Sequence, residues 1–153
     1  MLDLSRLNDH SHEFARRLFR EFPEWCRFAR FDPYEEFEKE ALLVEVPRPA
    51  EGGMHGLFVT TSEWEVSVGF GESFHARFGA SGDGHENFLD DAMNFIRDLV
   101  AERVAVAVAR QGDEWLGAWK LNPANHDLDT AEREDGVVIS IRSWRGTHDR
   151  DIT

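Results

Sequence analysis

The side chains that metal chemistry would use are seven histidines, one cysteine and thirty carboxylates. His10 and His12 are two residues apart, which places them on different sides of a helix, and the other histidines are scattered along the chain. Neither the His-Glu-x-x-His pattern nor the Cys-x-x-Cys pattern of zinc sites occurs. The sequence therefore predicts no metal site and no cofactor.

Nucleophilic catalysis has few candidates. Cys26 lies in an aromatic segment, where a thiol usually packs as a small hydrophobic group. The serine-hydrolase turn Gly-x-Ser-x-Gly is absent, because Gly82 follows Ser81 directly. The glycine-rich connector around these residues would suit a phosphate, but Asp83 as helix N-cap and Glu86 would repel an anion. We expect no catalytic residue.

Carboxylates stand beside tryptophans in Glu63-Trp64-Glu65 and Glu114-Trp115. This pairing keeps one alternative open, a carbohydrate or small-molecule binding protein, with or without hydrolase activity. A glycoside hydrolase needs two carboxylates across a cleft, whereas neighbours in a strand point to opposite faces. We expect core tryptophans with solvated glutamates.

Composition limits the class of protein. The chain has 153 residues, 41% of them hydrophobic, which predicts a single domain over 1–153. Its net charge of -13 disfavours nucleic acid and anionic membranes and favours cationic partners. One cysteine, no visible signal peptide and no long apolar run indicate a cytoplasmic location.

Periodicity predicts helices first and strands afterwards. Apolar spacing indicates a helix over 3–22, ended by Pro23, and Leu42 to Val46 is typical of a strand. Two alternating segments then predict a hairpin with a three-residue loop, in which Phe70 opposes Phe74, Val68 opposes Ala76 and Val66 opposes Phe78.

The second half of the chain predicts one long helix over about 84–102, packed on a mostly antiparallel sheet. The strand over 104–109 is apolar on both faces and should be central, with Val106 opposite Trp119 across a Gly-Asp turn. Residues 122–136 predict an exposed loop, 137–141 a last strand, and 147–153 a polar tail. The fold class is α+β.

Surface charge supplies the candidate binding residues. Two acidic clusters, one on the helix and one in the 122–136 loop, suit a cationic protein, and an arginine–tryptophan pair near the C-terminus is typical of interface anchors. The predicted partner-binding residues are Glu86, Asp90, Asp91, Asp98, Glu102, Asp127, Asp129, Arg142 and Trp144.

Several segments resemble a group of small bacterial proteins: Val44-Glu45-Val46-Pro47, the hairpin 65–78, the junction 95–104 and the ending Ile141-Arg142-Ser143-Trp144-Arg145-Gly146-Thr147. These are immunity proteins of polymorphic toxin systems, of the Rhs-type and contact-dependent kinds. The resemblance covers roughly residues 14–150 and rests mainly on core patterns. It implies a cytoplasmic protein that binds and neutralises one cognate toxin and needs no catalytic residue.

The hypothesis from sequence is therefore a non-catalytic immunity protein whose acidic surface binds a cationic toxin. Its rivals are the carbohydrate or small-molecule binding protein and a structural subunit of a larger complex. A tryptophan-lined pocket with two converging carboxylates would favour the first rival, and a homo-oligomer with a buried apolar face would favour the second.

Overall fold

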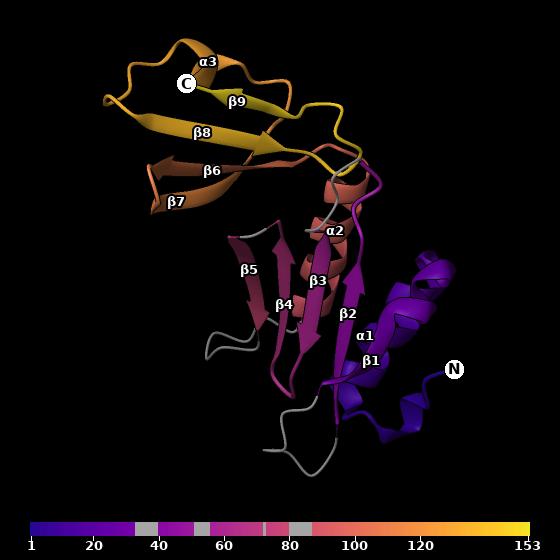
Figure 1. Ribbon diagram of the computed structural model, residues 1–153. Coiled ribbons are helices and arrows are strands. Elements are labelled where there is room, and N and C mark those ends of the chain that lie inside the picture. Colours follow the sequence, from indigo (N-terminus) through magenta and orange to yellow (C-terminus); the bar gives the residue numbers. More distant parts are fainter. Residues whose placement is uncertain (33–39, 51–55, 72, 80–86) are drawn as a thin grey trace.

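The computed structural model describes residues 1–32, 40–50, 56–71, 73–79 and 87–153 (Figure 1). In chain order the helical elements and strands are η1 (Leu4–Arg6), α1 (Asp9–Glu21), η2 (Pro23–Phe28), β1 (Ala29–Asp32), β2 (Ala41–Val46), β3 (Leu57–Thr61), β4 (Glu65–Phe70), β5 (Phe74–Gly79), α2 (Phe88–Val100), β6 (Ala105–Gln111), β7 (Glu114–Leu121), α3 (Asp127–Thr130), β8 (Val137–Arg142) and β9 (Arg150–Ile152). The α+β class is confirmed. The strands form two antiparallel sheets rather than one.

The first sheet has five strands in the order β1-β2-β3-β4-β5. The predicted register of its β4–β5 hairpin is confirmed, because Phe70 pairs with Phe74, Val68 with Ala76 and Val66 with Phe78. Gly71 opens the turn with φ +67°, a conformation that glycine adopts without strain. The sequence pattern predicted neither strand β1 nor strand β3.

Two helices of thirteen residues each pack against this sheet. Asn8 is the N-cap of helix α1, and its side chain accepts a hydrogen bond from the backbone N–H of Ser11. Pro23 follows the end of the helix. Helix α2 packs on β4 and β5. It is shorter than the predicted 84–102 and no longer than α1, so the expectation of one dominant helix is not confirmed. The predicted cap, Asp83 with Glu86, lies outside the described residues.

The second sheet has four strands in the order β7-β6-β8-β9, so the central position predicted for the 104–109 segment is confirmed for β6. The predicted β6–β7 register holds beside the turn, where Arg110 pairs with Trp115. It is wrong further on, because a bulge shifts the pairing by one residue and Val106 opposes Lys120, not Trp119. Trp119 instead joins the alanine face of β6.

The C-terminal segment is also different from the prediction. Residues 150–152 form the edge strand β9, and Ile152 is buried, so 147–153 is not a free polar tail. The polar side chains misled the pattern because β9 has only one apolar residue to bury. The 122–136 loop contains the short helix α3.

Two apolar clusters hold the described residues together. The larger, between the five-stranded sheet and both helices, has 22 buried residues. The smaller, on the alanine face of β6, has six. Trp144 belongs to the larger cluster although it follows β8, and its ring lies 6.3 Å from that of Phe70. This side chain therefore fastens the four-stranded sheet to the five-stranded one.

Candidate functional site

The groups considered for catalysis do not converge. Over the described ranges there is no group of three or more His, Cys, Asp or Glu side chains arranged to hold a metal ion. Cys26 is half-buried in η2. The glycine-rich connector at 80–86 lies outside the described residues.

The acidic face of α2 is largely paired with arginines. Asp90 forms an ion pair with Arg17 of α1, and the Asp98 carboxylate lies 2.8 Å from the Arg103 guanidinium. Asp91 is exposed and has no ion-pair partner within the described part of the chain. This face therefore presents less net charge than its sequence indicates. Glu86 lies outside the described residues.

Glu102 is a junction residue rather than a member of an open acidic face. Its backbone has φ +56°, and its largely buried carboxylate accepts a hydrogen bond from the backbone N–H of Arg145. His148 lies 3.7 Å from the same carboxylate. These contacts join the end of α2 to the segment between β8 and β9.

Two residues of the 122–136 loop, Asp127 and Asp129, are predicted to bind a partner, and of these Asp129 is already held by ion pairs. The carboxylate of Asp129 accepts hydrogen bonds from His126 and Arg150, which lower its pKa. Asp127 is exposed and has no ion pair with another described residue.

The arginine–tryptophan pair predicted as an anchor is mainly structural in this fold. Arg142 lies 2.8 Å from Asp151 and also donates to backbone carbonyls. Trp144 is only 5% exposed, so its ring does not project from the surface. Its inward packing was not predicted because the residues beside Trp144 in the sequence are polar.

Two other tryptophans stand on the surface, contrary to the expectation that they lie in the core. Trp64 is 63% exposed and Trp115 is 52% exposed. Leu116, the extra residue of the β7 bulge, is 45% exposed. At β7 the bulge leaves Leu116 without a partner on β6, while Trp115 still pairs with Arg110.

Exposed carboxylates lie near Trp115 and Leu116 at one end of the four-stranded sheet. Gln111 connects the two segments that carry them: it pairs with Glu114 in the strand ladder, and its side-chain Nε2 donates a hydrogen bond to the Asp135 backbone carbonyl oxygen at 2.8 Å. No ion pair joins these carboxylates to another residue in the described ranges. We call this surface the acidic tip and define it as Asp113, Glu114, Trp115, Leu116, Glu134 and Asp135.

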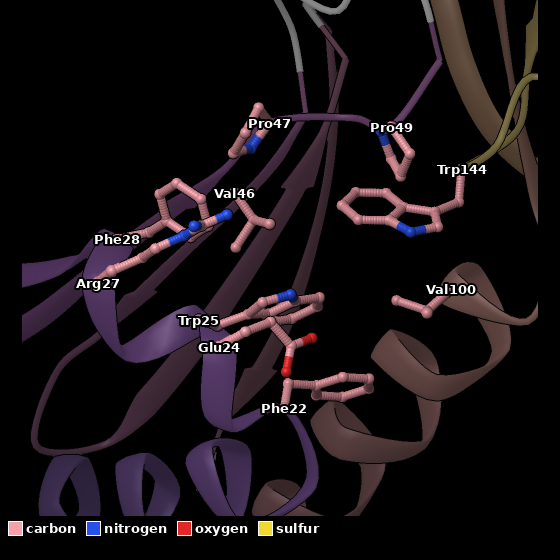
Figure 2. Close-up of a pocket in the computed structure, with 10 residues that line it drawn as sticks. All are labelled: Phe22, Glu24, Trp25, Arg27, Phe28, Val46, Pro47, Pro49, Val100 and Trp144. Atoms are coloured by element: carbon pink, nitrogen blue, oxygen red, sulfur yellow. The ribbon is translucent and has the colours of Figure 1, made fainter.

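A second feature is an apolar pocket of about 310 Å³ at the junction of the two sheets (Figure 2). Trp25 and Trp144 form its opposite sides, with ring centroids 6.0 Å apart and ring planes tilted by 52°. Phe22 stacks on Trp25 at 4.2 Å. The other residues that line it are Glu24, Arg27, Phe28, Val46, Pro47, Pro49 and Val100.

The pocket differs from a glycoside hydrolase site. Glu24 is the one carboxylate among the lining residues, and the Arg27 guanidinium lies over the Phe28 ring at 4.6 Å. Two facing carboxylates, which such an enzyme requires, are not among them. The pocket joins four segments that are distant in sequence, so periodicity had no means to find it. A signal for the acidic tip did exist, in the Gly-Asp turn followed by Glu114 and Trp115.

Comparisons with protein-family models, with curated proteins and with solved structures find no match to this chain. None of the helices in the described ranges has the length and apolar composition needed to cross a membrane.

Proposed function

We propose that this chain is a non-catalytic, cytoplasmic immunity protein that binds and neutralises a cognate bacterial toxin. The observation that carries the proposal is the acidic tip, where two exposed apolar side chains, Trp115 and Leu116, lie near exposed carboxylates that form no ion pair with another described residue. An apolar centre with a charged rim is the usual composition of a protein-binding surface.

The charge of the tip selects the kind of partner. Arginines pair with much of the acidic face of α2, whereas the carboxylates of the tip form no ion pair with another described residue. A toxin that acts on nucleic acid must itself present a cationic surface to its substrate, and unpaired carboxylates complement such a surface. Asp91 and Asp127 extend the same acidic character to α2 and α3.

Co-expression tests the proposal. The partner is the C-terminal domain encoded by the adjacent reading frame, and growth of the host reports whether this chain suppresses its toxicity. We expect the wild-type chain to restore growth and Trp115→Ala combined with Leu116→Ser to fail. Trp64→Ala is the matched control, since it removes another exposed tryptophan, which lies between β3 and β4, and should still protect. A harmless adjacent domain, or full protection by the tip variant, would contradict the proposal.

A further inference from the structure

The outer edge of β7 carries backbone groups that no other described part of the fold uses. β7 has eight residues and lies at one edge of the four-stranded sheet, where β6 is its neighbour (Figure 1). An edge strand presents a row of N–H and C=O groups that point away from its sheet. Apart from the pairing with β6, the backbone of β7 forms no hydrogen bond with a described residue. The edge is therefore an open row of donors and acceptors, which an extended backbone complements.

The other sheet edges in the described ranges suit an added strand less well. β1 has four residues and β9 has three, so each offers few hydrogen bonds to a new neighbour. β5 has six residues, but its exposed side chains include His75 and Arg77, which disfavour a cationic partner. β7 is longer than these three strands and begins at the acidic tip with Glu114.

Space and charge along β7 also suit a basic strand. A Cβ atom at Gly117 would meet no described heavy atom within 4 Å, so the surface over the middle of the strand is open. Lys120 Nζ lies 5.8 Å from the centroid of the Phe95 ring, which directs this cation toward α2. At the other end of the strand, Asp113 and Glu114 form no ion pair with another described residue.

We propose that the free edge of β7 binds an extended, basic segment of the partner protein as an additional strand. The segment pairs with residues 117–121, and its basic side chains lie beside Asp113 and Glu114. Main-chain hydrogen bonds supply affinity in such a complex, and side chains on alternate faces supply specificity. For the identity of the partner this inference rests on the proposed immunity function.

A second copy of this chain suits the edge less well than a basic segment does. Two copies each carry a net charge of -13 and repel one another. The bulge at Leu116 interrupts the regular edge that two β7 strands would share, and bulges are one means by which proteins limit edge-to-edge association. A segment that pairs with 117–121 alone does not cross the bulge.

The edge is tested first on the purified chain. The ligand is a heptapeptide of alternating lysine and valine, blocked at both ends, and amide hydrogen exchange of the ¹⁵N-labelled protein is followed by NMR. Near saturation, the outward amides of 117–121 should exchange about tenfold more slowly, because each gains a backbone hydrogen bond. The amides of β5 should exchange as they do in the free protein.

Two control peptides separate backbone pairing from charge. The first has two consecutive central residues N-methylated, which blocks both of its edges and keeps its charge. The second has glutamate in place of every lysine, which keeps its ability to form a strand and reverses its charge. Each should bind about tenfold more weakly than the basic peptide.

Charge reversal in the protein tests the contribution of the tip. Glu114→Lys should weaken binding of the basic peptide about threefold, as expected for an exposed charge pair. Glu24→Lys is the matched control, because it reverses an exposed carboxylate on η2, and it should bind as the wild type does.

The same exchange measurement on a complex with the proposed toxin partner separates this inference from the immunity function. Protection of 117–121 in that complex supports the added strand. A toxin that binds while these amides exchange as in the free protein overturns the inference and leaves the immunity proposal standing. A toxin domain that does not bind contradicts the immunity proposal, and the peptide result then decides on the edge alone.

Three results with the purified chain would also overturn the added strand. The first is that the basic peptide does not slow the exchange of β7. The second is that the N-methylated or the acidic peptide binds as tightly as the basic one. The third is that β7 becomes protected when the concentration of the chain alone is raised, which would assign the edge to a second copy.

Discussion

The two sheets of this protein differ in what covers them. The five-stranded sheet is packed by two helices through large apolar side chains such as Phe14 and Ile96, and many carboxylates around it are paired with arginines. The four-stranded sheet is covered on its alanine face by a small cluster and one four-residue helix. Its outer end exposes Trp115 near carboxylates that have no ion pair within the described ranges. The larger core cluster and the proposed binding surface thus lie in different parts of the molecule.

The difference in core size predicts the largest effect. Ile96→Ala and Ile152→Ala delete the same atoms from the large and the small cluster. We expect losses in the free energy of unfolding of about 4 and about 2 kcal/mol, because a short edge strand can close around a cavity more easily than a helix in a packed core. Urea denaturation followed by circular dichroism measures both values. Equal losses would remove the distinction between the two clusters.

The junction between the sheets predicts a smaller effect at Glu102. Alanine there removes the acceptor for the Arg145 backbone N–H and keeps a side chain in the left-handed conformation, so we expect a loss of about 1–2 kcal/mol. Glycine loses the same acceptor but adopts φ +56° freely, and it should be more stable than alanine by about 1 kcal/mol. Thermal denaturation of the two variants tests the order. A glycine variant less stable than the alanine variant would contradict the left-handed backbone.

The paired charges of the helical side predict the smallest effect. Hydrogen bonds from Arg16 and Arg17 lower the pKa of Glu13 from 4.5 to about 2. A lowered pKa in the folded state gives stability that is present above pH 4.5 and is lost as the pH falls toward 2. Because the pair is partly exposed, we expect only about 0.5 kcal/mol. The difference in stability between wild type and Glu13→Gln, measured from pH 6 to pH 2, should shrink over that window and stay constant above it.

Sequence patterns predicted those features of the fold that follow from the alternation of apolar and polar residues within a segment. The Phe70–Phe74 register was predictable because any other pairing would turn apolar side chains outward, and the central place of β6 followed from its two apolar faces. The bulge at Leu116 could not be predicted, because an extra residue leaves the composition of β7 unchanged. The inward position of Trp144 depends on contacts with Trp25 and Phe70, which are far away in sequence.

For the candidate site, the sequence predicted the sign of the charge but not the residues that carry it. A net charge of -13 predicts an acidic surface, but the sequence does not tell which carboxylates face arginines across the fold. Asp90 meets Arg17 from a different helix, whereas Asp113 and Asp135 meet no cation in the described ranges. The interpretation of the binding surface therefore moves from α2 toward the acidic tip.

The rate of association with the proposed toxin partner, measured by stopped flow at low and high salt, tests this account most directly. Reversal of the tip carboxylates, Asp113, Glu114, Glu134 and Asp135, to lysine should slow association at low salt at least tenfold and reduce its dependence on salt. Reversal of Asp90, Asp91 and Asp98 should have a smaller effect, because two of these three are already paired. An unchanged rate in the tip variant, or a larger effect in the helix variant, would contradict it.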